Sequence, residues 1–247
     1  MIEYDFSKEI ISASDVVNEI ENFPEVSLIC FDIRTESAIL EKYGKNVITY
    51  LPSSNCVREV YEIKCGFKRF AFTKSGIGGP AVASTIEELA ALGTKKIVLF
   101  GSSGSLVKNF TSGHIIVPIE AFRDEGASYH YLRPSNYINI TSARTTGKLL
   151  ESIKVPFIYG KTWTTDAFYR ETEEKFEKRR KEGCLTVEME CASAAAVAKY
   201  REIEFYCFLY TADSLDGDEW KRPDKSVIDE DFHGRIGDIA LTVAKGV

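Results

Sequence analysis

Histidine, tryptophan and methionine are scarce in this chain of 247 residues, which contains 3 His, 2 Trp and 2 Met. The 6 cysteines include no C-x-x-C pair, and no histidine lies at a metal-ligand spacing from them. These absences argue against a zinc site or a thioredoxin-like redox motif. Several cysteines lie inside apolar runs, so we expect buried free thiols in a reducing compartment.

Long apolar runs are also missing, so no segment is long enough to cross a bilayer. The first ten residues, MIEYDFSKEI, are too polar and acidic for a signal peptide. We therefore expect a cytoplasmic protein with no membrane partner. The formal net charge of −6 argues against nucleic acid as a partner. Small anionic substrates remain open, because a site can be locally positive on an acidic protein.

Repeats, low-complexity tracts and linkers rich in Gly, Pro or Ser are absent as well, which predicts one domain over residues 1–247. Apolar strand-like segments instead alternate with helix-like ones. We expect strands at 26–33, 57–66, 67–74, 95–101, 114–122, 155–163, 184–190 and 203–213, and helices at 80–93, 143–153, 171–183, 190–202 and 235–247. This order predicts an α/β fold, a mixed sheet with helices on both faces. Ligands in such folds bind beyond the carboxyl ends of strands.

Two glycine-rich segments follow predicted strands. SGIGGP (75–80) precedes a helix, and its Gly76 would let the backbone approach an anion or a polar oxygen at the helix N-terminus. GSSGSL (101–106) places the hydroxyls of Ser102 and Ser103 beside a possible ligand. Neither segment is a dinucleotide fingerprint or a P-loop, and a plain strand-to-helix turn is an equally good interpretation of the first.

Three further segments place chemistry at strand ends. In VEMECASAAAVA (187–198), Glu188 and Glu190 lie in an otherwise apolar run, where burial of two carboxylates is costly unless they have a function. A carboxylate can accept both hydroxyls of a ribose, although acidic residues also cap helices. Asp213 ends the strand in YTADSLDGDEW and would need a raised pKa to act as a general acid. Phe168 and Tyr169 in TTDAFYRET could stack on a planar base or simply belong to the core.

In this order the motifs resemble the nucleoside phosphorylase and nucleosidase superfamily, the branch that contains uridine phosphorylase, hexameric purine nucleoside phosphorylases and methylthioadenosine nucleosidase. The resemblance spans roughly residues 26 to 245, and VEME is its most specific part. It implies a nucleoside phosphorylase-like three-layer α/β/α domain. It also implies that this protein cleaves the N-glycosidic bond of a nucleoside, its small-molecule partner. Members assemble as dimers or rings of dimers, so a homodimer or a hexamer (a trimer of dimers) is expected.

The resemblance also implies residue roles. Glu190 would bind the ribose hydroxyls, with Met189 against the sugar and Ser102 nearby. Phe168 would stack on the base, whose edge the backbone around Tyr169 could bind, and Asp213 would protonate it. Uridine phosphorylases carry a longer insertion before VEME, whereas only ETEEKFEKRRKEGCLT intervenes here. A purine-type base is therefore favoured over uracil.

Arginine is missing from the places where phosphorolytic members hold phosphate. Thr35, Asn55 and Leu99 occupy the three matching positions. Without charge-assisted hydrogen bonds from the protein, the free-energy cost of removing water from a phosphate dianion would not be offset. Arg34 and Arg58 lie near two of these positions and could hold phosphate if the alignment to the family is shifted by a few residues. Gly76 and Ser102 could then also contact the phosphate or another anion. Leu99 has no such replacement.

The nucleosidase branch instead carries acidic residues after the first strand, the last of which activates water. ICFDIRTESAIL matches this pattern with Glu36 at the position of the general base. An exposed glutamate in the first turn of a helix is an equally ordinary interpretation. The favoured hypothesis is hydrolysis, with Asp213 as acid and Glu36 as base and with no metal or organic cofactor. Phosphorolysis, with phosphate as co-substrate, and a catalytically silent nucleoside-binding or storage protein are the alternatives.

Overall fold

The computed structural model describes residues 4–5, 7–52, 57–108, 110, 112–216 and 220–247. Its strands are β1 (Val26–Cys30), β2 (Asn46–Leu51), β3 (Arg58–Cys65), β4 (Lys68–Lys74), β5 (Lys96–Ser105), β6 (Ile115–Asp124), β7 (Tyr137–Asn139), β8 (Phe157–Thr165), β9 (Cys184–Glu188) and β10 (Glu204–Ser214). Its α-helices are α1 (Ile33–Tyr43), α2 (Gly79–Leu92), α3 (Ser128–Tyr131), α4 (Ala143–Ser152), α5 (Glu173–Lys181), α6 (Cys191–Tyr200) and α7 (Glu230–Gly246). Short 3₁₀ turns lie at Ala13–Asp15 and Phe168–Arg170.

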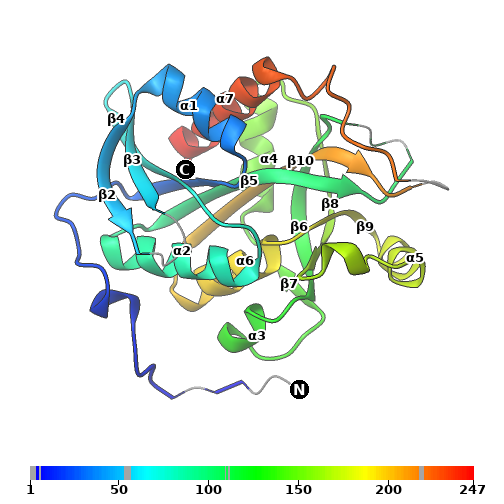
Figure 1. Ribbon diagram of the computed structural model, residues 1–247, viewed down its shortest axis with the longest axis horizontal. Helices are drawn as coiled ribbons and strands as arrows, with labels where there is room; N and C mark the ends of the chain where they lie inside the picture. The colour runs from blue at the N-terminus through cyan, green and yellow to red at the C-terminus, as the bar shows by residue number, and fades with distance from the viewer. Residues whose placement is uncertain (1–3, 6, 53–56, 109, 111, 217–219) are drawn as a thin grey trace.

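The strands form one mixed ten-stranded sheet in the order β10-β6-β8-β9-β5-β1-β4-β3-β2, with β7 paired to β6. Helices α1, α4 and α7 cover one face and α2 and α6 the other (Figure 1). A mixed sheet flanked by helices is the predicted fold class, which is thereby confirmed. The sequence pattern did not predict that β10 also pairs with β5, so that β10, β6, β8, β9 and β5 close into a ring.

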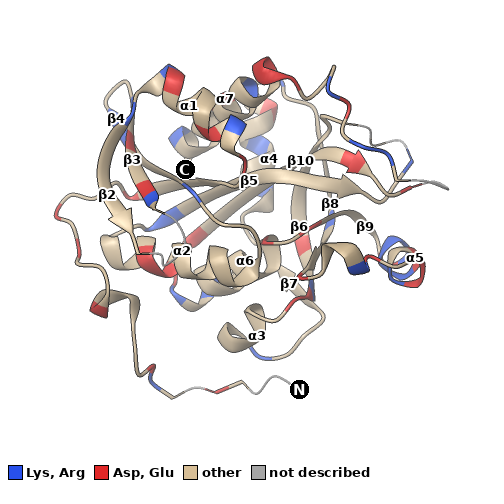
Figure 2. Ribbon diagram, viewed as in Figure 1, with Lys and Arg blue, Asp and Glu red and all other residues tan. Residues whose placement is uncertain are grey.

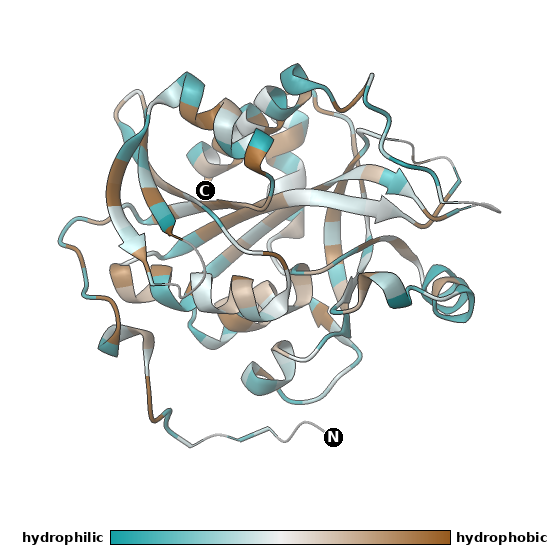
Figure 3. Cartoon of the chain, in the orientation of Figure 1, coloured by the Kyte–Doolittle hydropathy of each residue, from teal (hydrophilic) through white to brown (hydrophobic). Residues whose placement is uncertain are grey.

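Local signals account for most of these elements. α2 begins with Pro80 in its first turn, and the backbone N–H of Gly93 closes its C-terminus by donating to carbonyls of the last turn. β3 and β4 form the expected antiparallel hairpin, which turns at Gly66. α6 is buried over eight of its ten residues, and its run of small side chains lets it lie close to α2. Figure 3 shows the apolar residues gathered on the central strands and on the inner sides of the helices.

Several boundaries differ from the prediction. The segment 101–106, expected as a glycine-rich turn, continues β5 as a strand to Ser105. It stays extended because β10 pairs with it on one side and β9 on the other, and these ladder hydrogen bonds override the local glycine preference. α7 begins at Glu230, five residues earlier than expected, where Asp229 accepts a hydrogen bond from the backbone N–H of Phe232 and caps the helix.

Five described cysteines are unpaired, and all but Cys65 are buried. This matches the expectation of free thiols for those five, while Cys56 lies outside the described residues. Among the helices of the described ranges, none combines the length and the apolar character that a bilayer span requires.

Candidate active site

The carboxyl ends of several strands enclose a cavity of about 170 Å³. Its lining comes from the ends of β1, β5, β9 and β10 and from the segments that follow β4 and β8. The residues are Phe31, Ile77, Ser102, Ser103, Gly104, Phe168, Glu171, Val187, Glu188, Met189, Glu190, Asp213 and Leu215. We call this cavity the strand-end pocket. Seven of the residues singled out from the sequence lie in its wall together: Ser102, Ser103, Phe168, Glu188, Met189, Glu190 and Asp213.

Acidic side chains dominate the charged and titratable groups of the strand-end pocket. Four of its lining residues are acidic, namely Glu171, Glu188, Glu190 and Asp213. Within the described part of the chain, no lysine, arginine or histidine lines it. Figure 2 shows basic residues gathered on α5. The pocket is therefore electrostatically suited to a ligand that carries or develops positive charge.

The two glutamates of the VEME segment have different surroundings. Glu188 accepts four hydrogen bonds: from the hydroxyls of Thr164 (2.6 Å) and Thr162 (3.2 Å) and from the backbone N–H groups of Glu190 (2.7 Å) and Cys191 (2.6 Å). Burial raises the pKa of Glu188, and these hydrogen bonds act against the rise. Glu188 thus holds the start of α6 against β8.

Glu190 is the carboxylate that remains available to a ligand. It is 7% exposed, and one of its oxygens accepts a hydrogen bond of 2.6 Å from the backbone N–H of Gly78. Burial, followed by repulsion from Glu188, raises the pKa of Glu190 to about 8. Backbone hydrogen bonds from Gly78 and Met189 act against this rise. A carboxylate has about four acceptor sites, so Glu190 can still accept hydroxyl groups of a ligand.

The N-terminus of α2 is therefore occupied by a protein carboxylate. Gly78 is its N-cap, with φ of 95°, a left-handed conformation that favours glycine. Its N–H points to Glu190, 112 residues away in the chain, and the positive end of the helix stabilises that carboxylate. Ile77 lines the pocket, whereas Gly76 does not. From the sequence, this helix end was expected either to bind an anion or a polar oxygen of a ligand or to be a plain turn.

Asp213 stands at the end of β10 and is held by a neighbouring indole. The Nε1–H of Trp220 donates to its Oδ2 at 2.6 Å. Gly104 on β5 makes room beside it, because a Cβ at this glycine would lie 2.7 Å from Leu215 Cδ1 and 3.4 Å from Asp213 Oδ1. A larger residue in the GSSGS segment would thus displace the wall of the pocket next to Asp213.

Sequence reasoning missed Glu171, which also lines the strand-end pocket. Burial, and then repulsion from Asp213, raises the pKa of its carboxyl to about 7. In the sequence it lies among the glutamates of ETEEKFE and reads as the start of a charged helix, but α5 begins only at Glu173. Its position three residues after Phe168, beyond the end of β8, was the available signal.

Of the two aromatic residues singled out from the sequence, one has its side chain in the pocket wall. Phe168 lines the pocket and is half exposed, whereas Tyr169 is 93% exposed and is not part of the wall. The two rings meet edge to face with centroids 5.0 Å apart. Phe31, which the sequence did not single out, also lines the pocket, and its ring lies against Gly101, where a Cβ would be 3.0 Å from it.

Two of the residues at the positions expected for phosphate-binding arginines are buried in the fold. Thr35 is 2% exposed, and its hydroxyl lies 2.8 Å from Nδ1 of His233 on α7. Leu99 is fully buried in the middle of β5. Asn55 lies outside the described residues.

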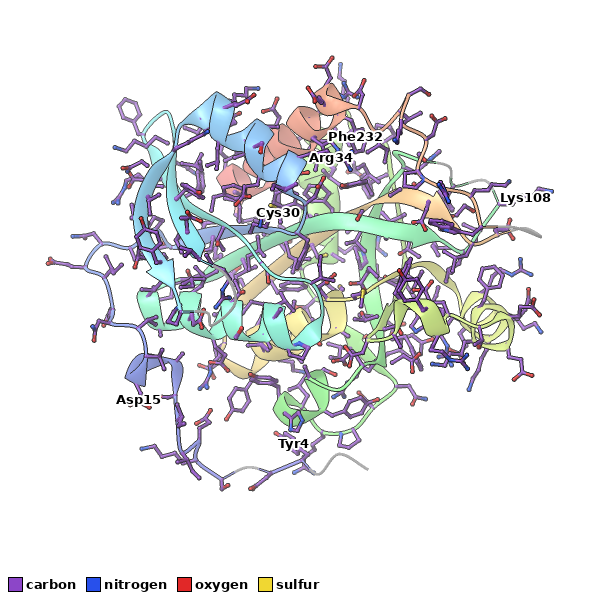
Figure 4. All side chains as sticks on the ribbon, viewed as in Figure 1. Tyr4, Asp15, Cys30, Arg34, Lys108 and Phe232 are labelled. Atoms are coloured by element: carbon purple, nitrogen blue, oxygen red, sulfur yellow. The ribbon has the colours of Figure 1, made fainter. Side chains whose placement is uncertain are left out.

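The two arginines considered as substitutes do not line the pocket. Arg34 is largely exposed in the first turn of α1, and its Nε lies 3.6 Å from Asp32. This end of α1 lies near the start of α7 (Figure 4). Arg58 is 9% exposed at its side chain and pairs with Glu88 at 2.8 Å, while it also donates to the hydroxyl of Thr85.

Glu36, predicted as the general base, also lies outside the pocket wall. It occupies the first turn of α1, and its Oε2 is 3.7 Å from Nζ of Lys74 at the end of β4. Burial raises its pKa, and the positive charge of Lys74 acts in the opposite direction. The structure therefore places Glu36 in an ion pair beside the pocket and not among its lining residues.

Arg58→Ala is expected to lower the free energy of unfolding by about 3 kcal/mol, because Glu88 would be left as an uncompensated buried charge. Urea denaturation of the variant and the wild type measures the difference. Lys42→Ala, which removes the exposed pair with Asp238, is the matched control and should cost about 1 kcal/mol or less. Equal losses in the two variants would contradict a structural role for Arg58.

Comparison with known proteins adds independent findings. A model of the phosphorylase superfamily matches residues 29–243. A uridine phosphorylase of Thermococcus kodakarensis is 38% identical over 100 residues, which are 39% of this chain and 36% of that enzyme. A DeoD-type purine nucleoside phosphorylase of Colwellia psychrerythraea is 26% identical over 159 residues, 60% of this chain and 68% of that enzyme. The match to the Thermococcus enzyme thus spans little more than a third of its length.

Solved structures share the fold. Uridine phosphorylase from Vibrio fischeri superposes with a TM-score of 0.76 at 20% identity, over 97% of this chain and 98% of that one. Futalosine hydrolase of Helicobacter pylori does so with a TM-score of 0.73 at 17% identity, over 91% of this chain and 100% of that one. A phosphorylase and a hydrolase therefore resemble this fold about equally well, and the fold alone does not decide between phosphate and water.

Proposed function

This chain belongs to the phosphorylase superfamily, and from that premise we propose that it hydrolyses the N-glycosidic bond of a purine-type nucleoside. One observation carries the choice of water as nucleophile: four acidic side chains, and no described basic one, line the strand-end pocket. The positions where phosphate-binding arginines were sought hold buried Thr35 and Leu99.

Electrostatics favours hydrolysis over phosphorolysis in such a pocket. A phosphate dianion about 5 Å from an ionised carboxylate is repelled by roughly 7 kcal/mol at an effective dielectric constant of 20. The sugar in the transition state of glycosidic cleavage carries the opposite charge, because it resembles an oxocarbenium ion. Those acidic groups of the pocket that are ionised therefore lower the barrier to bond breaking while they disfavour a phosphate nucleophile.

The proposal assigns roles to the lining residues. Glu190 accepts the ribose hydroxyls with the oxygen that Gly78 leaves free, and Met189 and Ser102 lie beside the sugar. Phe168 stacks on the base and Asp213 protonates it as it leaves. Because an oxocarbenium-like sugar is strongly electrophilic, a neutral water can attack C1′, and Glu36 has no direct part.

The expected result is phosphate-independent release of free ribose. Purified protein would be assayed on adenosine, inosine, guanosine and uridine, in phosphate-free buffer and with added phosphate, with separation of ribose from ribose 1-phosphate. Equal rates in both buffers and ribose as the sugar product support hydrolysis, and faster turnover of the purine nucleosides supports the base assignment. Ribose 1-phosphate as product would overturn the choice of water.

Phosphorolysis is the second candidate, and the names of the relatives favour it. The Thermococcus and Colwellia proteins are named as phosphorylases, and the first of them as a uridine phosphorylase. In that case Arg34 or a group outside the described residues would have to meet the phosphate, and uridine would be cleaved fastest. Tight nucleoside binding without turnover in either buffer would instead support a silent binding protein.

A further inference from the structure

Glu171 is a second carboxyl group on the wall of the strand-end pocket to which Asp213 contributes. It lies just beyond the 3₁₀ turn that carries Phe168, and its backbone N–H donates to the carbonyl of Phe168 at 3.4 Å. Phe168 is the residue proposed to stack on the base. The carboxyl group of Glu171 is therefore tied to the part of the pocket where the leaving base would lie.

The environments of the two carboxyl groups differ. The oxygen Oδ2 of Asp213 accepts a hydrogen bond from the indole of Trp220, whereas none of the described residues donates a hydrogen bond to the side chain of Glu171. Burial and the negative charge of Asp213 bring the pKa of Glu171 to about 7. When two carboxyl groups share a site, one tends to keep a proton while the other ionises.

The other charged groups around Glu171 do not supply a counter-ion. Glu188 and Glu190 line the same pocket and are acidic. Arg180 of α5 pairs with Asp216, in the segment after β10, at 3.1 Å and with Glu177 at 2.9 Å. Arg180 is thus paired with other carboxylates, and none of the described lysines, arginines or histidines forms an ion pair with Glu171.

We propose that Glu171 and Asp213 form a carboxyl–carboxylate pair that holds one proton and delivers it to the leaving base. This inference rests on the proposed nucleosidase function. In the step, the bond between C1′ and the base nitrogen breaks and its electron pair goes to the base, which takes the proton of the pair on a ring nitrogen. Water then forms a bond to C1′, and the proton that it loses restores the pair. Nucleoside and water become ribose and neutral base.

The test uses Glu171→Gln, which keeps the shape of the side chain and removes the acidic proton. We expect kcat/KM on the best purine nucleoside to fall about 10²-fold at pH 7. The wild-type rate should fall as pH rises through about 7, because the pair then loses its proton, and this limb should move or vanish in the variant. Glu173→Gln, an exposed glutamate on α5, is the matched control and should behave as wild type.

A second substrate separates proton delivery from mere structure. In 7-methylguanosine the base already carries a positive charge and leaves without taking a proton, so Glu171→Gln should cleave it within about threefold of the wild-type rate. Equal losses on both substrates, or an unchanged pH profile, would overturn the inference while hydrolysis by the wild type still stands. A wild type that cleaves no nucleoside would overturn the proposed function and this inference together.

Discussion

Replacement of Glu190 by glutamine is expected to reduce kcat/KM by about 10²- to 10⁴-fold and to stabilise the folded protein at alkaline pH. At pH values above about 8, where Glu190 is ionised, two hydrogen bonds from ribose hydroxyls to a charged acceptor are lost, each of which contributes roughly 1.5–3 kcal/mol. Glutamine still offers an oxygen to the N–H of Gly78, so the start of α2 keeps its partner. Steady-state kinetics on the best nucleoside measures the loss.

The stability of this variant has a defined dependence on pH. Burial and Glu188 raise the folded pKa of Glu190 to about 8, above its ordinary value of 4.5. The contribution of Glu190 to stability is therefore full below pH 4.5 and is lost as pH rises toward 8. Glutamine does not titrate, so the variant should match the wild type near pH 4.5. By pH 8 it should exceed the wild type by about 2–4 kcal/mol.

Urea unfolding at a series of pH values tests this expectation. Glu173→Gln serves as the control, because that side chain is exposed and its replacement should change stability by less than about 0.5 kcal/mol at every pH. A Glu190→Gln variant that is less stable than the wild type at pH 8 would show that the charged form is favoured in the folded state. The pocket would then be far less electrostatically strained than its four acidic residues suggest.

The second large effect is expected at Asp213. Asp213→Ala should lower the rate of purine nucleoside cleavage by about 10²- to 10⁴-fold, since the base would leave without a proton. Asp213→Asn keeps an oxygen for the indole of Trp220 and should lose nearly as much activity, which separates the acid from its structural contact. Asp224→Asn, in an exposed position of the same connection to α7, is the control and should retain full activity.

The combination with Glu171 makes this prediction sharper. If the two carboxyl groups hold one proton as a unit, Glu171→Gln should add little to the loss already caused by Asp213→Asn. Independent roles would instead give losses that multiply. Little or no loss on purine nucleosides in Asp213→Ala alone would remove Asp213 from the role of acid.

Most of the sheet and its helices could be predicted from local sequence. Apolar runs identified the buried strands, and Pro80 and Gly93 marked the ends of α2, because these signals act within a few residues. The VEME segment and Asp213 were found because acidic residues stand out at the ends of apolar strands. Local preference failed at 101–106, where two partner strands hold a glycine-rich segment in an extended form.

The contacts between side chains far apart in the chain could not be predicted from the sequence. Nothing local indicates that Arg58 pairs with Glu88, thirty residues away, and so lies outside the pocket wall. Residue type alone does not distinguish Glu188, which fixes the start of α6, from Glu190, and only the resemblance to the superfamily favoured Glu190 as the ribose ligand. Glu171 was hidden among other glutamates of a charged segment, and only burial beside Asp213 sets it apart.

By itself, the sequence determined the class of fold and the strand ends at which chemistry should lie. It also showed that threonine and leucine occupy positions 35 and 99, where phosphate-binding arginines were expected. Only the tertiary structure decided which charges meet. The fold brings four acidic residues into the wall of one pocket. Arg58 and Glu36 form ion pairs with Glu88 and Lys74 and do not line that pocket. The N-terminus of α2 donates a hydrogen bond to Glu190. The physical reason is that electrostatic interactions depend on distance and burial, and both are set by contacts between segments far apart in the chain.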